Sequence, residues 1–138
     1  MRYFDASALV KRYVREKGSV KVRRLLSSGV SATCRLSAVE IISALMRRSR
    51  EGAFGDAERN RAFAAIPGDM SALLVVELTP EIVARAHALL QRHTLRAGDT
   101  IQLASALFLQ EELGEETTFV AFDERLSAAA RGEHLRVE

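Results

Sequence analysis

Four acidic residues, Asp5, Glu40, Asp99 and Asp123, lie near the starts of expected helices in this 138-residue chain. If they converge, each pair of carboxylates about 5 Å apart repels by about 3 kcal/mol at an effective dielectric of about 20. Some must then stay protonated, or a cation lies among them. Oxygen ligands alone suit Mg²⁺ or Mn²⁺ better than zinc. Such an ion polarises a phosphate and generates hydroxide from water, so the four acids predict phosphodiester hydrolysis without a covalent protein nucleophile.

Each acid taken singly also has a structural explanation, because helix starts attract carboxylates. The three aspartates are good N-caps and would be stabilised by the positive end of a helix. Ser37 and Glu40 have capping-box spacing, and Asp99 with Gln102 could pair similarly. Capping is the more frequent explanation for any one acid. The set of four is what favours a metal site.

The elements that must position these acids alternate along the chain. Strands are expected at Arg2–Phe4, Val30–Thr33, Leu73–Leu78, Thr117–Phe122 and Leu135–Val137. Helices are expected at about Ser7–Arg15, after Ser19, at Ser37–Arg50, from Asp56 to Pro67–Gly68, and at Pro80–Arg92, Thr100–Glu112 and Asp123–Arg131. The segment 73–78, which is apolar except for Glu77, is typical of a buried parallel strand.

Strands separated by helices pair in parallel through right-handed crossovers, so the pattern predicts an α/β fold with α/β/α layers. The central sheet is expected to be mainly parallel, and one domain is expected to span 1–138. Ligands of such folds bind beyond the carboxyl ends of the strands. Asp5 and Asp123 directly follow expected strands. The sequence therefore predicts that the acids meet at one edge of the sheet.

The overall composition fits a globular domain, with 48% hydrophobic and 28% charged residues. Apolar runs such as Leu73–Val76 are too short to cross a membrane, no secretory signal is expected at the N-terminus, and Cys34 cannot form an internal disulfide. A cytoplasmic location is expected. The formal charge of +2 establishes no partner. Only three of the 20 basic residues are lysine; arginine forks suit phosphates, although codon bias explains the excess equally well.

Four segments resemble the motifs of PIN-domain proteins in the same order. They are Tyr3–Lys11, Ser37–Ile41, Leu95–Ala104 and Phe119–Leu126, and together they span nearly the whole chain. The resemblance implies a single PIN-like domain whose acidic metal site is formed by Asp5, Glu40, Asp99 and Asp123, with support from the Ser7 hydroxyl. It also implies Mg²⁺ as cofactor, with Mn²⁺ as a substitute.

The chain is most similar to VapC-type toxins of toxin–antitoxin pairs. That similarity implies a metal-dependent endoribonuclease, an RNA substrate, a cognate antitoxin and a homodimer. Two residues depart from the motif or compete with it: Ala6 stands where many relatives have a hydroxyl residue, and Glu124 adjoins Asp123 and could point inward instead. Both leave the set of four carboxylates intact.

Basic residues near the acids could hold the RNA backbone, and the candidates are Lys11, Arg12, Arg96 and Arg125. A solvated helix face is the alternative for each. Other functions also remain open: an RNA-processing PIN nuclease outside a toxin–antitoxin pair, or a non-catalytic RNA-binding or interaction module. A dehalogenase-like phosphatase would need a second aspartate where Ser7 stands, and a receiver domain would need a lysine where Glu124 and Arg125 stand.

Overall fold

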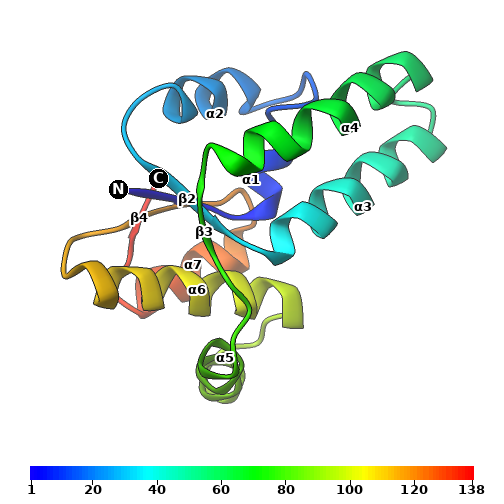
Figure 1. The fold of residues 1–138 in the computed structure, drawn as a ribbon. Helices are drawn as coiled ribbons and strands as arrows, with labels where there is room; N and C mark the ends of the chain where they lie inside the picture. Colours follow the sequence, from blue (N-terminus) through cyan, green and yellow to red (C-terminus); the bar gives the residue numbers. More distant parts are fainter.

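The computed structural model describes residues 1–138 as a five-stranded parallel sheet with helices on both faces (Figure 1). The strands are β1 (Arg2–Phe4), β2 (Ser31–Cys34), β3 (Leu74–Val76), β4 (Thr118–Val120) and β5 (Arg136–Val137). The helices are α1 (Ala6–Val10), α2 (Ser19–Leu26), α3 (Leu36–Arg50), α4 (Asp56–Ser71), α5 (Pro80–Arg92), α6 (Ala97–Leu113) and α7 (Glu124–Gly132). This confirms the predicted layered α/β fold with a parallel sheet.

The sheet has the order β3-β2-β1-β4-β5, so the first strand of the chain lies at its centre. Arg2 pairs with Ser31 of β2 on one side and with Thr118 of β4 on the other. Figure 1 shows α1 to α4 on one face of the sheet and α5 to α7 on the other. None of the helices combines the length and the apolar character needed to span a membrane.

Alternate side chains of the central strands form the two cores, because successive residues of a strand face opposite sides. Tyr3 belongs to the core beneath α5, α6 and α7, where its ring stacks on Phe119 with 5.6 Å between the ring centroids. Phe4 and Val120 belong to the other core, together with Ile41 of α3. The sheet is therefore held from both sides, and the ends of its central strands are fixed.

Helix α4 continues through Pro67 to Ser71, so the prediction that Pro67–Gly68 ends this helix is wrong. A proline inside a helix costs about 3 kcal/mol. Ile66 and Met70, one turn apart, are both buried against the core, and burying each such side chain contributes about 1.5–3 kcal/mol. Tertiary packing thus outweighs the local signal for a break.

Strand β3 lies at the edge of the sheet and covers only Leu74–Val76. The predicted parallel strand is therefore confirmed, but its predicted burial and its extent over 73–78 are wrong. It pairs with β2 alone, and Leu74 is 39% exposed. An apolar run specifies a strand but not the number of neighbours that cover it.

Helix α1 ends earlier than expected, at Val10. The amides of Lys11, Arg12 and Tyr13 bond to carbonyls three residues back, which tightens the chain into turns. A short α1 followed by turns places successive side chains of this segment on different sides of the molecule.

Candidate active site

Three of the four acids line one cavity of about 730 Å³ at the carboxyl edge of the sheet. Asp5 follows β1, Glu40 lies on α3, and Asp99 lies in the first turn of α6. The cavity is also lined by Ser7, Lys11, Glu16, Arg47, Arg48, Arg96, Gly98 and Phe122. Segments far apart in the sequence thus place acidic and basic side chains around one cavity.

Asp5 is only 2% exposed and is held at the N-terminus of α1. One carboxylate oxygen accepts a hydrogen bond from the Ala8 amide at 2.8 Å, and the Ser7 hydroxyl lies 2.8 Å from both oxygens. Burial raises the pKa of Asp5 to about 7; the Ala8 and Ser7 hydrogen bonds oppose this shift, and the charges of Asp99 and Glu40 add to it. The side chain is therefore poised to exchange a proton for a cation near neutral pH.

Glu40 has a buried carboxylate oxygen, Oε1, without a hydrogen-bond partner. The predicted capping box with Ser37 is wrong: α3 begins at Leu36, so Ser37 lies inside the helix and its hydroxyl is bonded elsewhere. Burial raises the pKa of Glu40, and the charge of Asp99 raises it further. Leaving a buried acceptor unpaired is costly, so capping does not explain this residue.

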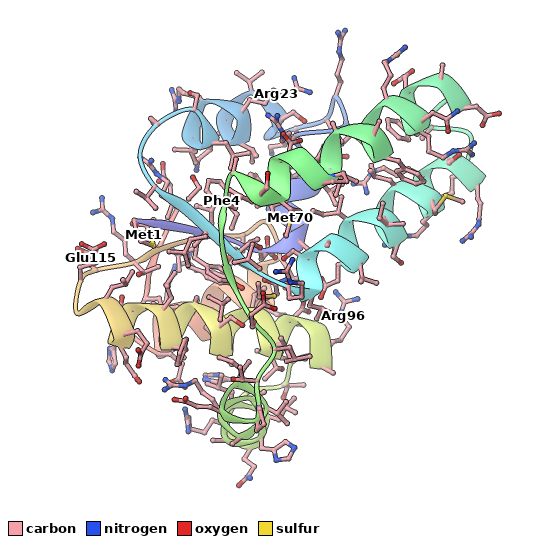
Figure 2. All side chains as sticks on the ribbon, viewed as in Figure 1. Met1, Phe4, Arg23, Met70, Arg96 and Glu115 are labelled. Atoms are coloured by element: carbon pink, nitrogen blue, oxygen red, sulfur yellow. The ribbon has the colours of Figure 1, made fainter.

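Asp99 lies in the first turn of α6, which starts one turn earlier than expected and has Arg96 as its N-cap. Its carboxylate accepts a hydrogen bond from the Arg96 guanidinium at 3.3 Å. A Cβ atom on Gly98 would lie 2.9 Å from Oε1 of Glu40. A side chain at position 98 would therefore require the Glu40 carboxylate to move. Figure 2 shows Arg96 where the first turns of α3 and α6 come together.

A chain of buried hydrogen bonds joins the elements that carry Asp5, Glu40 and Asp99. Tyr3 donates to Oε1 of Gln102 at 2.8 Å, and the Gln102 amide donates to the Ser37 hydroxyl at 2.9 Å. Thr33 donates to the carbonyl of Phe4, so Ser37 must donate to Thr33, 2.6 Å away. The Ser37 proton is thus engaged and cannot serve Glu40. The predicted pairing of Gln102 with Asp99 is wrong: Asp99 lies inside α6 rather than at its N-cap, and the Gln102 side chain bonds to Tyr3 and Ser37.

Ser7 links Asp5 to the segment after β4. Its hydroxyl faces the carboxylate and accepts a hydrogen bond from the Phe122 amide at 3.3 Å. The Phe122 ring packs on Gly18, where a Cβ would lie 2.5 Å away, and the Lys11 ammonium lies 4.5 Å from the ring centroid. Ser7 therefore lies where the resemblance expects it, although its role in catalysis stays a prediction.

Asp123 does not line this cavity. Strand β4 ends at Val120 rather than at Phe122, and the Asp123 carboxylate caps α7 by accepting a hydrogen bond from the Leu126 amide at 2.9 Å. Its role as a metal ligand stays a prediction. The neighbouring Glu124 pairs with Arg131 at 3.3 Å on the surface.

The residues present fit a cation better than a purely structural role. No three carboxylate, imidazole or thiol groups stand close enough to form a ready-made metal cage. The fit rests instead on the unpartnered buried oxygen of Glu40 and on the buried Asp5 beside it. Both are oxygen ligands of the kind that hard divalent ions prefer.

Of the basic candidates, Lys11 and Arg96 line the acidic cavity, whereas Arg12 and Arg125 do not. Arg12 is bound to Asp69 in a different hollow. Glu16, which belongs to none of the sequence motifs, accepts hydrogen bonds from the Lys11 ammonium and from the Arg48 guanidinium, both at 3.0 Å. Its carboxylate thus holds the basic side chains of Lys11 and Arg48 at the rim of the cavity.

Comparison with known proteins agrees with this fold and assigns the chain to a family. Residues 2–132 match the family described as the PIN domain, and the chain belongs to that family. Ribonuclease VapC45 of Mycobacterium tuberculosis (strain CDC 1551 / Oshkosh) is 34% identical over 142 residues, covering 98% of this chain and 92% of the relative. Ribonuclease VapC49 of strain H37Rv matches equally well. The resemblance to PIN-domain, VapC-type ribonucleases is therefore confirmed.

Solved structures share the fold. The sarcin-ricin loop cleaving toxin VapC20 of M. tuberculosis has a TM-score of 0.69 at 23% identity, covering 94% of this chain and 95% of its own. A toxin–antitoxin complex from Klebsiella pneumoniae has a TM-score of 0.62 at 16% identity, with coverages of 89% and 87%.

Proposed function

We propose that this protein is a divalent-metal-dependent endoribonuclease and the toxin of a VapBC-type toxin–antitoxin pair. The observation that carries the proposal is the cavity in which the unpartnered oxygen of Glu40 lies with the buried Asp5 and with Asp99. It occurs in a PIN-domain chain that is 34% identical to a curated ribonuclease over almost its whole length.

Asp5, Glu40 and Asp99 would hold Mg²⁺, or Mn²⁺ in its place, and the family resemblance adds Asp123. The bound ion supplies Lewis-acid chemistry, polarising the scissile phosphate and lowering the pKa of the attacking water. Asp5, whose pKa is raised to about 7, would have to be ionised to serve as a ligand. Ser7 fixes the orientation of that carboxylate through its hydroxyl.

The basic side chains around the cavity would bind the RNA itself. Lys11, Arg47, Arg48 and Arg96 all line it. They would offset the charge of the phosphates that approach three carboxylates, and would hold the strand while one bond is hydrolysed. A structured RNA is a suitable target by analogy with VapC20, which is a sarcin-ricin loop cleaving toxin.

The expected partners are a cognate antitoxin and a second copy of the chain. The toxin–antitoxin complex from K. pneumoniae, which shares the fold, supports the first. For the homodimer, we propose a strip of α5 on which Val83 and Leu90, 41% and 42% exposed, lie two turns apart on either side of the exposed His87. We expect the protein to act in the cytoplasm, where a cellular RNA substrate would be available.

The test is cleavage of total cellular RNA by purified protein with Mg²⁺ or Mn²⁺ and with EDTA. Asp5→Asn and Asp99→Asn should each lower cleavage by at least about 100-fold. The matched control is Asp56→Asn, which neutralises an exposed acid at the start of α4 and should cleave like the wild type. Circular dichroism would confirm that all variants are folded. If the wild-type protein neither binds the metal nor cuts RNA, the proposal is contradicted and the acids are interpreted as helix caps.

A further inference from the structure

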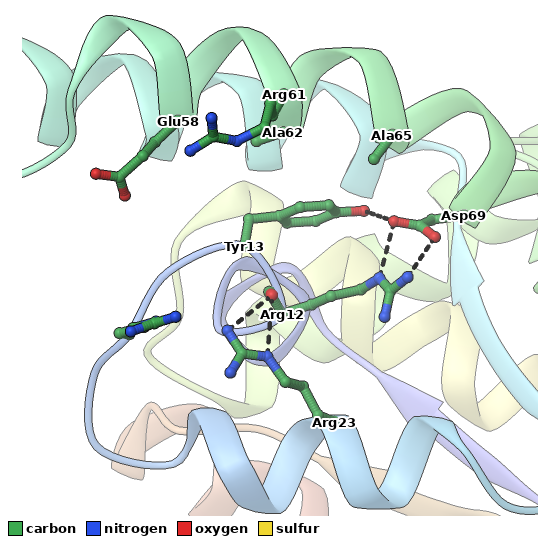
Figure 3. Close-up of a pocket in the computed structure, with 9 residues that line it drawn as sticks. Arg12, Tyr13, Arg23, Glu58, Arg61, Ala62, Ala65 and Asp69 are labelled. Atoms are coloured by element: carbon green, nitrogen blue, oxygen red, sulfur yellow. Dashed lines mark hydrogen bonds and ion pairs between the residues drawn. The ribbon is translucent and has the colours of Figure 1, made fainter.

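A second cavity of about 670 Å³ lies between α2, α4 and the turns that follow α1 (Figure 3). It shares no lining residue with the acidic cavity. Four of its nine lining residues are arginines, which are Arg12, Arg15, Arg23 and Arg61. None of them is needed for the acidic site, so the cavity calls for its own explanation.

The wall of this cavity is already built by hydrogen bonds (Figure 3). The Arg12 guanidinium donates two hydrogen bonds to the Asp69 carboxylate, at 2.8 and 2.6 Å, and the Tyr13 hydroxyl donates to the same carboxylate at 2.8 Å. Arg23 crosses from α2 and donates to the carbonyls of Arg12 and Val14 at 3.2 to 3.3 Å. A preformed wall saves a ligand part of the entropy cost of ordering it.

The charge that remains in the cavity is positive. The Arg12 guanidinium holds the pKa of Asp69 below its usual range, so this pair stays ionised and neutral overall. The other three guanidinium groups face a single carboxylate, that of Glu58. Arg15 and Arg61 are exposed and make no side-chain hydrogen bond or ion pair within the protein. Two complete guanidinium forks are thus free for an anion.

The two cavities flank one short segment of chain. Lys11 and Glu16 line the acidic cavity, whereas Arg12, Tyr13 and Arg15 line the arginine cavity. The turns after α1 send these side chains to opposite sides. A strand that leaves the acidic cavity across this segment would meet Arg15 next.

We propose that the arginine cavity is an RNA exosite: it binds a backbone phosphate of the substrate other than the phosphate that is cut. This inference rests on the proposed ribonuclease function. Planar guanidinium forks match phosphate oxygens in a bidentate manner. Only three lining residues, Tyr13, Ala62 and Ala65, are apolar or aromatic, which favours a polyanion over a protein segment that needs hydrophobic anchors. Recognition would be of the backbone and not of the bases.

The test is binding of fluorescein-labelled single-stranded RNA in EDTA, with mixed-sequence oligonucleotides of about four and about sixteen nucleotides. Arg15→Gln/Arg61→Gln is compared with Lys21→Gln/Arg24→Gln, which removes two charges from α2 outside the cavity. The cavity variant should bind the long RNA about tenfold more weakly than the control. The slope of log K against log[salt] should be shallower by about 0.7 for each phosphate that the variant no longer binds. The short RNA should bind both variants alike.

Three outcomes would overturn the exosite. An equal decrease in the affinity of the two variants for the long RNA, relative to the wild type, would show only a general charge effect. If the cavity variant lost affinity equally for the short and the long RNA, the arginines would lie at the site of cleavage. Unchanged RNA binding with weakened binding of the purified antitoxin would make the cavity a protein contact. Metal-dependent cleavage by the wild type, measured separately, decides the proposed function, because each of these outcomes can occur in an active nuclease.

Discussion

At the scale of single residues, Asp5 combines a structural and a chemical role. Its carboxylate caps α1 through the Ala8 amide, yet it is almost fully buried beside two other acids. The hydrogen bonds favour the ionised form and the burial opposes it, and the balance leaves the pKa about 7. A cap at the helix surface would have no such conflict.

This conflict predicts a pH dependence of stability in the metal-free protein. The folded-state pKa of Asp5 is raised from 3.8 to about 7, so the folded state binds the extra proton between these values. The stability is fully present below about pH 4 and falls as pH rises through 7, by up to about 4 kcal/mol. Denaturant unfolding in EDTA between pH 5 and 8 would show this decrease, and Asp5→Asn should flatten it. A wild-type profile as flat as that of the variant would contradict the assigned pKa.

Glu40→Gln should separate stability from function. Removing the charge from a buried oxygen without a partner should raise the free energy of unfolding in EDTA at pH 8 by about 1 kcal/mol, or about 3 °C in Tm. The same change should weaken Mn²⁺ binding at least about 100-fold, as measured by calorimetry. A variant that is less stable and still binds metal normally would make Glu40 structural.

At the scale of elements, the site depends on how closely α6 approaches α3. Gly98→Ala places a methyl group 2.9 Å from Oε1 of Glu40, so the glutamate must shift. Cleavage should fall roughly 10–100-fold while the fold is retained. Gly68→Ala is the matched control, because nothing lies within 4 Å of its Cβ and α4 should gain roughly 0.5–1 kcal/mol. Equal activity of the two variants would show that the close approach does not matter.

The sequence predicted the strands, the parallel sheet and the positions of three acids at one edge, because hydrophobic patterning and strand ends are local signals. It failed where long-range contacts decide. The spacing of Ser37 and Glu40 predicted a capping box, but the Ser37 hydroxyl instead accepts a hydrogen bond from Gln102, 65 residues away. Likewise, the prediction that the helix ends at Pro67 did not include the burial of Met70, which lies in the part of α4 after the proline. The side-chain direction of Asp123 depends on where β4 ends, which no spacing rule fixes.

At the scale of the whole molecule, the strip on α5 should control the oligomeric state. Val83→Glu/Leu90→Glu puts two charges on an exposed apolar face and should convert a dimer to a monomer in light scattering. Val20→Glu, at an 80% exposed position on α2, is the control and should leave the mass unchanged. A double variant that keeps the mass of the dimer would place the interface elsewhere.

The position of β1 at the centre of the sheet has a consequence for synthesis. Its two neighbours come from residues 31–34 and 118–120, and Ser7 beside Asp5 is tied to the amide of residue 122. Pairing so distant in the sequence forms slowly, and not before the later strand has been made. Most of this chain must therefore leave the ribosome before the central strand is paired on both sides and Ser7 is tied to the amide of residue 122.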